Sequence, residues 1–161
     1  MKESFPVDEF RSYEKQKELL QRQDYQLKVF EQEGQVVGFC AYYIFDEFIY
    51  IEHLACKEWA RGLGIGTKLV QEVLDGAGEL TVILEVEVPM DEVTKRRVHF
   101  YERLGFVLNT YPHYQPPLNE TTGIVELKIM SSFKGLKEEE QKQFRRILNQ
   151  KVYGVDRDFN L

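Results

Sequence analysis

The sequence has few cysteines and histidines and no long apolar run, and so lacks the features that mark disulfide-rich, metal-binding and membrane-spanning proteins. Its 161 residues include two cysteines and three histidines, and no apolar run approaches membrane-spanning length. Cys40 and Cys56 both lie in apolar, strand-like runs, which predicts reduced and buried thiols. His99 and His113 have no partner at metal-ligand spacing, so we expect no metal. The first residues lack the apolar core of a secretion signal. These absences predict a cytoplasmic protein that does not enter a membrane.

Positive charge is also scarce. Lysine and arginine number 21 against 27 aspartate and glutamate residues, and the net charge is −6. This balance argues against nucleic acid as a general partner. The hydrophobic fraction of 43% and the charged fraction of 30% are typical of a globular chain. The length predicts a single domain over residues 1–161, as a monomer or a homodimer.

The most informative stretch is a glycine-rich turn at residues 61–67, Arg-Gly-Leu-Gly-Ile-Gly-Thr. It lies between an apolar run at 48–56, a predicted strand, and an amphipathic run at 65–74, a predicted helix. Glycine adopts backbone angles that other residues avoid. The free N–H groups at a helix start bind anions, most often phosphate. We therefore interpret the turn as a phosphate site, with an ordinary strand-to-helix loop as the alternative.

The spacing narrows the kind of phosphate ligand. A P-loop requires Gly-Lys-Ser/Thr, whereas this chain has Gly66-Thr67-Lys68. The dinucleotide-binding fingerprint needs a third glycine where Thr67 stands. Glu85 nevertheless lies about twenty residues further on, where that fingerprint has an acidic residue. A nucleotide-binding α/β protein therefore stays open as an alternative.

Apolar periodicity and turn residues predict the remaining elements. We expect helices at residues 6–22, 65–74, 91–104 and 137–153, and strands at residues 24–32, 36–45, 48–56, 80–88, 106–111 and 124–131. Residues 112–119 are expected to form a loop. The first strands form an antiparallel meander, and the helix between 48–56 and 80–88 makes a crossover that predicts a parallel pair. The fold class is mixed α/β with about six to seven strands.

Two motifs carry a resemblance to a known family. Leu54-Ala55-Cys56 followed by the turn at 61–66 resembles the acetyl-CoA motif of the GNAT superfamily of N-acetyltransferases. The segment 100–106, Phe-Tyr-Glu-Arg-Leu-Gly-Phe, is similar to the late helix of that family. The resemblance covers a family core at about residues 25–131 and leaves a C-terminal helical extension at about 134–161. It implies two parallel strands that splay apart to admit acetyl-CoA.

The resemblance also implies which residues bind the cofactor. Strand amides at the apolar triplet would bind the pantetheine arm, and the turn would bind the diphosphate. Thr94 stands where many members have an asparagine that touches the pantetheine arm. The implied positions are Leu54, Ala55, Cys56, Arg61, Gly62, Leu63, Gly64, Ile65, Gly66, Thr67, Thr94 and Tyr101. The triplet Lys95-Arg96-Arg97 either meets the CoA phosphates or forms a solvated face.

Two residues are implied as catalysts. Tyr101 matches a tyrosine that protonates the CoA sulfur, and a core aromatic is the alternative. Glu85 matches a segment where some members place a catalytic glutamate. Glu87, Glu52, His53 or a water relay also stay open as the general base, and Glu52 and His53 would point to opposite faces of a regular strand. For Glu85 and each of these three residues, a solvated strand residue or a surface charge pair is the alternative.

The implied reaction is direct transfer of acetyl from acetyl-CoA to a primary amine within a ternary complex. The acidic residues near the site favour a cationic acceptor, either a small molecule or a peptide. The loop from Tyr111 to Asn119, which includes His113, is where the family commonly shapes the acceptor pocket. The alternative is a non-catalytic module that binds an acyl-CoA for sensing or interaction.

Overall fold

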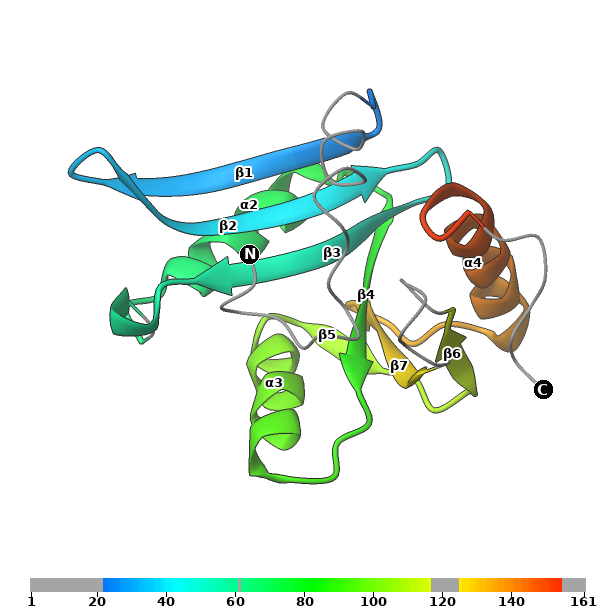
Figure 1. Cartoon of the computed structure of the whole chain (residues 1–161). Helices are drawn as coiled ribbons and strands as arrows, with labels where there is room; N and C mark the ends of the chain where they lie inside the picture. Colours follow the sequence, from blue (N-terminus) through cyan, green and yellow to red (C-terminus); the bar gives the residue numbers. More distant parts are fainter. Residues whose placement is uncertain (1–21, 61, 117–124, 155–161) are drawn as a thin grey trace. The chain divides into compact units, whose positions relative to one another are not determined.

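A computed structural model describes residues 22–60, 62–116 and 125–154 (Figure 1). The helix predicted at residues 6–22 lies outside these ranges, apart from Arg22. The described elements are β1 (Tyr25–Gln32), β2 (Gln35–Ile44), β3 (Phe48–Cys56), the 3-10 turn η3 (Glu58–Ala60), α2 (Ile65–Gly76), β4 (Thr81–Glu87), α3 (Glu92–Arg103), β5 (Phe106–Leu108), β6 (His113–Gln115), β7 (Val125–Ser132) and α4 (Glu138–Lys151).

The described strands form one mixed seven-stranded sheet. Its order is β1-β2-β3-β4-β7-β5, and β6 pairs with β7. The neighbours β3 and β4 are joined through α2, and this crossover gives the parallel pair that the sequence predicted. The prediction of a mixed α/β fold with about six to seven strands is confirmed.

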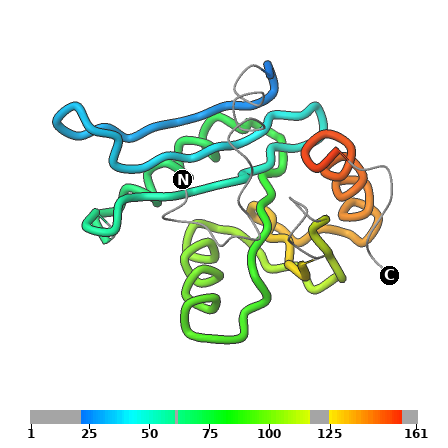
Figure 2. The backbone as a smooth tube through the Cα atoms, viewed as in Figure 1, coloured from blue at the N-terminus to red at the C-terminus, as the bar shows by residue number. Residues whose placement is uncertain are grey.

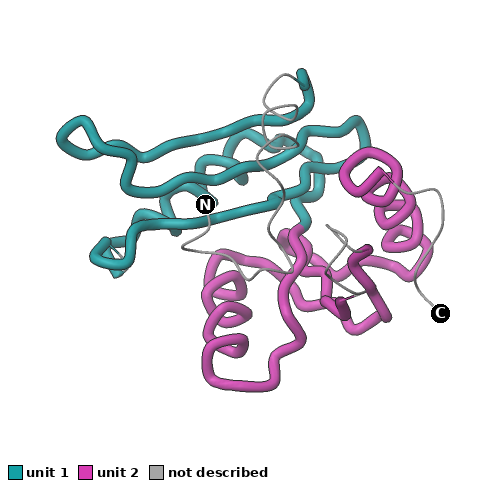
Figure 3. Tube along the Cα trace, in the orientation of Figure 1, with its two compact units in different colours: residues 1–5, 12–83 teal, residues 6–11, 84–161 magenta. Residues whose placement is uncertain are grey.

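The chain divides into two compact units, which are described one at a time (Figure 3). Among the described residues, unit 1 runs from 22 to 83 and unit 2 from 84 to 154, so the boundary falls inside β4. The single domain stays a prediction.

Unit 1 begins with two consecutive hairpins, blue to cyan in Figure 2. The first turn is tight because Glu33 and Gly34 both have positive φ, 54° and 80°, a conformation that favours residues such as glycine. Helix α2 then buries the apolar face predicted for it. That face consists of Ile65, Leu69, Val70, Val73 and Leu74. Each such side chain contributes about 1.5–3 kcal/mol when fully buried.

Unit 2 contains a strand that the sequence did not predict. β6 lies within the segment predicted to be a loop, and it pairs with β7 in antiparallel register, His113 opposite Leu127. β5 is shorter than predicted and ends at Leu108. The reason is Asn109, whose buried amide donates to the carbonyl of Ile129 at 3.0 Å and accepts from the backbone N–H of Leu136 at 2.7 Å. The backbone N–H of Asn109 also donates to the carbonyl of Ile129 at 2.9 Å, and the regular pairing of β5 with β7 does not extend beyond it.

Candidate functional site

The glycine-rich turn in unit 1 has the backbone geometry that only glycine adopts readily. Gly62 and Gly64 have φ of 89° and 81°, in the left-handed region. Gly64 is the N-cap residue of α2, while Gly66 lies inside the helix. Arg61, a predicted contact of the diphosphate, lies outside the described residues. The predicted turn into the helix is therefore present, and two of its three glycines carry its conformation. Its role as a phosphate site stays a prediction.

The N-terminus of α2 differs from those of the other described helices. Gly64 has no side chain, so within the described residues no side-chain cap bonds the first turn, which also holds no acidic residue. The first turn of α3 is capped by Asp91, and that of α4 contains three glutamates. The first amides of a helix carry partial positive charge and attract anions. The first turn of α2 thus carries this partial charge with no acidic side chain among its own residues.

A glycine of β2 that the sequence analysis overlooked allows α2 to pack closely on that strand. Gly38 pairs with Cys56 across β2 and β3. A Cβ on Gly38 would lie 3.0 Å from Cγ2 of Ile65 and 3.1 Å from the carbonyl oxygen of Ala55. The close packing of Ile65, the first residue of α2, and of the end of β3 around this position of β2 thus favours glycine.

The predicted pantetheine contacts lie at the end of β3. Leu54 and Cys56 are half-buried, and Ala55 is buried. Cys56 was predicted to be buried, and that expectation is wrong, because its position at the last residue of the strand leaves part of the side chain exposed. Cys40 is fully buried as predicted, and burial raises the pKa of its thiol to about 12.

Glu52 and His53 were predicted to point to opposite faces of a regular strand, and this is wrong. Ala41 pairs with His53 while Tyr42 pairs with Ile51, so Glu52 is the extra residue of a β-bulge. The bulge brings Nε2 of His53 to 3.6 Å from Oε1 of Glu52. Both side chains are buried, which excludes the solvated-charge alternative for Glu52.

Glu85 in unit 2 lies in a buried polar cluster. Its carboxylate bonds to Nε2 of His113 through one oxygen and to the hydroxyl of Tyr153 through the other. The Tyr153 hydroxyl also accepts a 3.0 Å hydrogen bond from the amide of Gln115. The side chains of Glu85 and His113 are only 4% and 1% exposed. The alternative that Glu85 is a solvated strand residue is therefore wrong.

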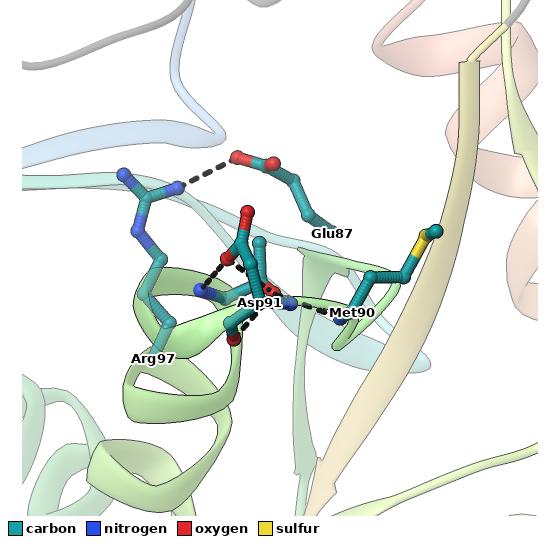
Figure 4. A network of polar contacts seen from close by, with 5 residues as sticks. Glu87, Met90, Asp91 and Arg97 are labelled. Carbon is teal, nitrogen blue, oxygen red and sulfur yellow. Dashed lines mark hydrogen bonds and ion pairs between the residues drawn. The ribbon is translucent and has the colours of Figure 1, made fainter.

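Glu87, a further candidate for the general base, has a different environment. Its Oε1 accepts a 2.9 Å hydrogen bond from the guanidinium of Arg97, and both side chains are partly exposed (Figure 4). Arg97 thus pairs with a carboxylate of the chain, and the Nε of Arg96 donates to the carbonyl of Glu92 at 3.3 Å. Two of the three residues in the basic triplet have partners on the chain.

Thr94 has a structural role that the sequence analysis did not consider. Its hydroxyl accepts from the backbone N–H of Met90 at 2.9 Å and of Asp91 at 3.0 Å, while its own N–H donates to Asp91 at 2.8 Å (Figure 4). This capping box fixes the start of α3. The hydrogen bonds from Thr94 to Asp91 lower the pKa of that carboxyl. A cofactor contact by Thr94 stays a prediction.

Tyr101 lies in α3 and is half-buried. Its ring meets those of Phe100 and Phe106 edge-to-face, with centroids 5.0 Å and 5.7 Å away. These contacts fix the ring, as expected both for a core aromatic and for a positioned acid. The role of Tyr101 as an acid stays a prediction.

Sequence reasoning missed the other members of the Glu85 cluster. It placed His113 only in a loop that shapes an acceptor pocket, and it gave Gln115 and Tyr153 no role. His113 and Gln115 are two residues apart and both buried, which is the period of one strand face. That signal was present, but it spans only three residues between prolines.

Two negative findings apply to the described ranges. Over residues 22–60, 62–116 and 125–154, no group of three or more histidine, cysteine and acidic residues could hold a metal ion. None of the helices in the same ranges is long and apolar enough to cross a membrane.

A family model and a related sequence both match this chain to acetyltransferases. The model of the acetyltransferase (GNAT) family matches residues 1–106. A Bacillus subtilis protein named "Putative acetyltransferase YjbC" is 31% identical over 109 residues, which is 66% of this chain. This chain spans about half, 54%, of the length of that relative.

Solved structures share the fold. A protein described as a "putative acetyltransferase from GNAT family" from Bacteroides thetaiotaomicron is 33% identical, with a TM-score of 0.85 over 95% of this chain and 87% of its own. A GNAT family acetyltransferase from Elizabethkingia anophelis, solved with acetyl-CoA bound, is 17% identical, with a TM-score of 0.56. That match covers 75% of this chain and 82% of the other.

Proposed function

Because the chain belongs to the acetyltransferase (GNAT) family, we propose that it transfers the acetyl group of acetyl-CoA to a primary amine by direct attack. The observation that carries the proposal is the start of α2. There, glycines with positive φ open onto helix amides that are neither capped by a side chain nor accompanied by an acidic residue, within the described residues. This is the local chemistry that a diphosphate requires.

The residues of unit 1 fit the cofactor. The amides of Gly62 to Thr67 would hold the diphosphate of CoA, and Arg61 would add a positive charge. Leu54, Ala55 and Cys56 would bind the pantetheine arm through their backbone, which suits the half-buried end of β3. Acetyl-CoA supplies a thioester whose carbonyl carbon accepts the amine. The Elizabethkingia anophelis protein, with its bound acetyl-CoA, supports this choice of cofactor.

The residues of unit 2 would handle the protons. The amine must lose a proton before it attacks, and the departing CoA thiolate must gain one. Tyr101, fixed between two phenylalanine rings, is the proposed acid, because a tyrosine hydroxyl ordinarily stays protonated at neutral pH. The cluster around Glu85 is the proposed site of proton acceptance. Its negative charge favours an acceptor that arrives as an ammonium ion.

A thiol-release assay tests the proposal. The purified chain is mixed with acetyl-CoA and a panel of small amines and peptides, and free CoA is measured. We expect turnover with at least one amine and a CoA-dependent rise of Tm that NAD and ATP do not produce. A rise of Tm without turnover would favour the acyl-CoA-binding sensor. A rise with NAD or ATP alone would refute both and favour a nucleotide-binding protein.

A further inference from the structure

We propose that His113, held by Glu85 and Tyr153, is the proton acceptor of the acetyl transfer. This inference rests on the proposed function and changes the role of Glu85, which becomes the positioning residue for the imidazole. All three residues belong to unit 2. His113 and Tyr153 lie beyond residue 106, where the match to the family model ends. The segment after the matched region would therefore be part of the catalytic machinery.

Both carboxylate oxygens of Glu85 already have hydrogen-bond donors. One oxygen is bonded to His113 and the other to Tyr153, and the side chain is almost completely buried. A buried carboxylate requires such bonds, because it has lost its hydration. Because each of its oxygens already has a donor, this carboxylate is better suited to orient a neighbour than to take a proton from an incoming amine.

The hydrogen bonds that Glu85 makes with His113 and Tyr153 have a definite direction. An ionised carboxylate only accepts, so Nε2 of His113 must donate to Glu85. The hydroxyl of Tyr153 accepts from the amide of Gln115 and uses its own hydrogen to reach Glu85. The proton of a neutral imidazole is thereby fixed on Nε2. The remaining nitrogen of His113, Nδ1, then carries a lone pair.

In the described part of the chain, nothing binds this lone pair. Nδ1 of His113 is buried and, within the described residues, has no hydrogen-bond partner. An unsatisfied buried polar atom destabilises the fold and therefore calls for an explanation. A histidine with one nitrogen bonded to a carboxylate and the other open is the arrangement that catalytic triads use for a general base. Nδ1 of His113 meets this description.

The proposed acetyl transfer removes two protons from the acceptor ammonium group. The ammonium group of the acceptor loses one N–H proton to Nδ1 of His113, and the freed lone pair forms a bond to the thioester carbonyl carbon. The C–S bond then breaks, and its electron pair leaves as the CoA thiolate, which takes a proton from Tyr101. The imidazolium that forms on His113 pairs with Glu85, and it later returns its proton to water. The acetylated nitrogen then loses its second proton, through water, to the phenolate of Tyr101, so that the products are a neutral amide, the CoA thiol and one proton released to water.

A spectroscopic experiment tests the geometry without a substrate. The ¹⁵N-labelled full chain contains three histidines, and the His113→Gln variant assigns the signals of His113. We expect a neutral imidazole protonated on Nε2 at pH 7.5, in wild type and in Tyr153→Phe. In Glu85→Gln, loss of the carboxylate should give a mixture of the two tautomers. An Nδ1-protonated or doubly protonated ring in the wild type would overturn the proposal.

A kinetic experiment tests the role. In the thiol-release assay, His113→Gln should lower kcat about 10²- to 10⁴-fold, as expected for the loss of a general base. Tyr153→Phe should lower kcat several-fold and leave the KM for acetyl-CoA unchanged. Tyr25→Phe, which removes a buried tyrosine hydroxyl from β1 in unit 1, is the matched control and should keep the wild-type kcat.

The outcomes separate the two proposals. Should wild type release no thiol with any amine, the proposed function and the inference both fall. Should wild type turn over while His113→Gln keeps kcat within twofold, only the inference falls, and Glu85 returns as the direct base. Thermal melts of each variant show whether a lost kcat reflects unfolding. In that case the tautomer of His113 in the intact wild-type chain decides the matter.

Discussion

The two glycines Gly64 and Gly34 offer a matched test of the cofactor turn. Gly64 has φ of 81° and Gly34 has φ of 80°, and a Cβ added at either would meet no atom within 4 Å. Alanine at either position therefore changes only the backbone preference. The left-handed conformation costs an L-residue about 1–2 kcal/mol, so both substitutions should lower the free energy of unfolding by that amount.

The two variants should differ in cofactor affinity. Gly34 is in the turn between β1 and β2, whereas Gly64 is the N-cap of α2. In Gly64→Ala the turn relieves part of its strain by moving away from the left-handed region. The first backbone N–H groups of α2 then no longer point toward the same anion. We expect Gly64→Ala to weaken acetyl-CoA binding at least about tenfold, which is about 1.4 kcal/mol. Gly34→Ala should bind as tightly as wild type.

Urea unfolding gives the stability of both variants, and isothermal titration calorimetry gives their Kd for acetyl-CoA. The reasoning fails if Gly64→Ala and Gly34→Ala bind acetyl-CoA equally well, because the turn would then be only a structural connection. It also fails if either variant is as stable as wild type, because the positive φ would then carry no strain.

Three further predictions follow from unit 1 and from the start of α3. Cys56 is half-buried, so it should react with a thiol reagent in the native protein, and acetyl-CoA should protect it. Cys40 should react only after unfolding, because burial raises the pKa of its thiol to about 12. Mass spectrometry counts the modified thiols. Gly38→Ala should destabilise the protein by about 1–3 kcal/mol in urea unfolding, because its Cβ meets backbone at 3.1 Å, and an unchanged midpoint would contradict this. Because the pKa of Asp91 is lowered in the folded protein, its helix cap should stabilise the fold fully above pH 3.8, the ordinary pKa. This stabilisation should be lost as the pH falls through the lowered pKa, so the unfolding free energies of wild type and Asp91→Ala should converge in acid. A difference that stays constant with pH would contradict this prediction.

The elements that the sequence predicted well have strong local signals. β3 has the predicted bounds because its apolar run is closed by a turn on one side and by the glycine stretch on the other. Helix α2 begins at the predicted Ile65 because its apolar face repeats at helical spacing. Both signals are contained within about ten residues of chain, which is the range over which periodicity is informative.

The features that sequence reasoning missed depend on residues far apart in the chain. The bulge at Glu52 is set by the register between β2 and β3, and no pattern within β3 reveals it. β6 is too short for periodicity, and the neighbouring Pro112 and Pro116 indicate a loop. The bond between Tyr153 and Glu85 joins positions 68 residues apart, so only the tertiary fold could reveal why Glu85 is buried.

The position of Tyr153 has a consequence for anyone who shortens this protein. A chain cut after Ser132 would keep every described strand and the whole stretch recognised by the family model. It would nevertheless lack Tyr153, whose hydroxyl bonds to the carboxylate of Glu85, 68 positions earlier in the chain. Trimming the chain after Ser132 is therefore a change in the buried polar cluster of unit 2.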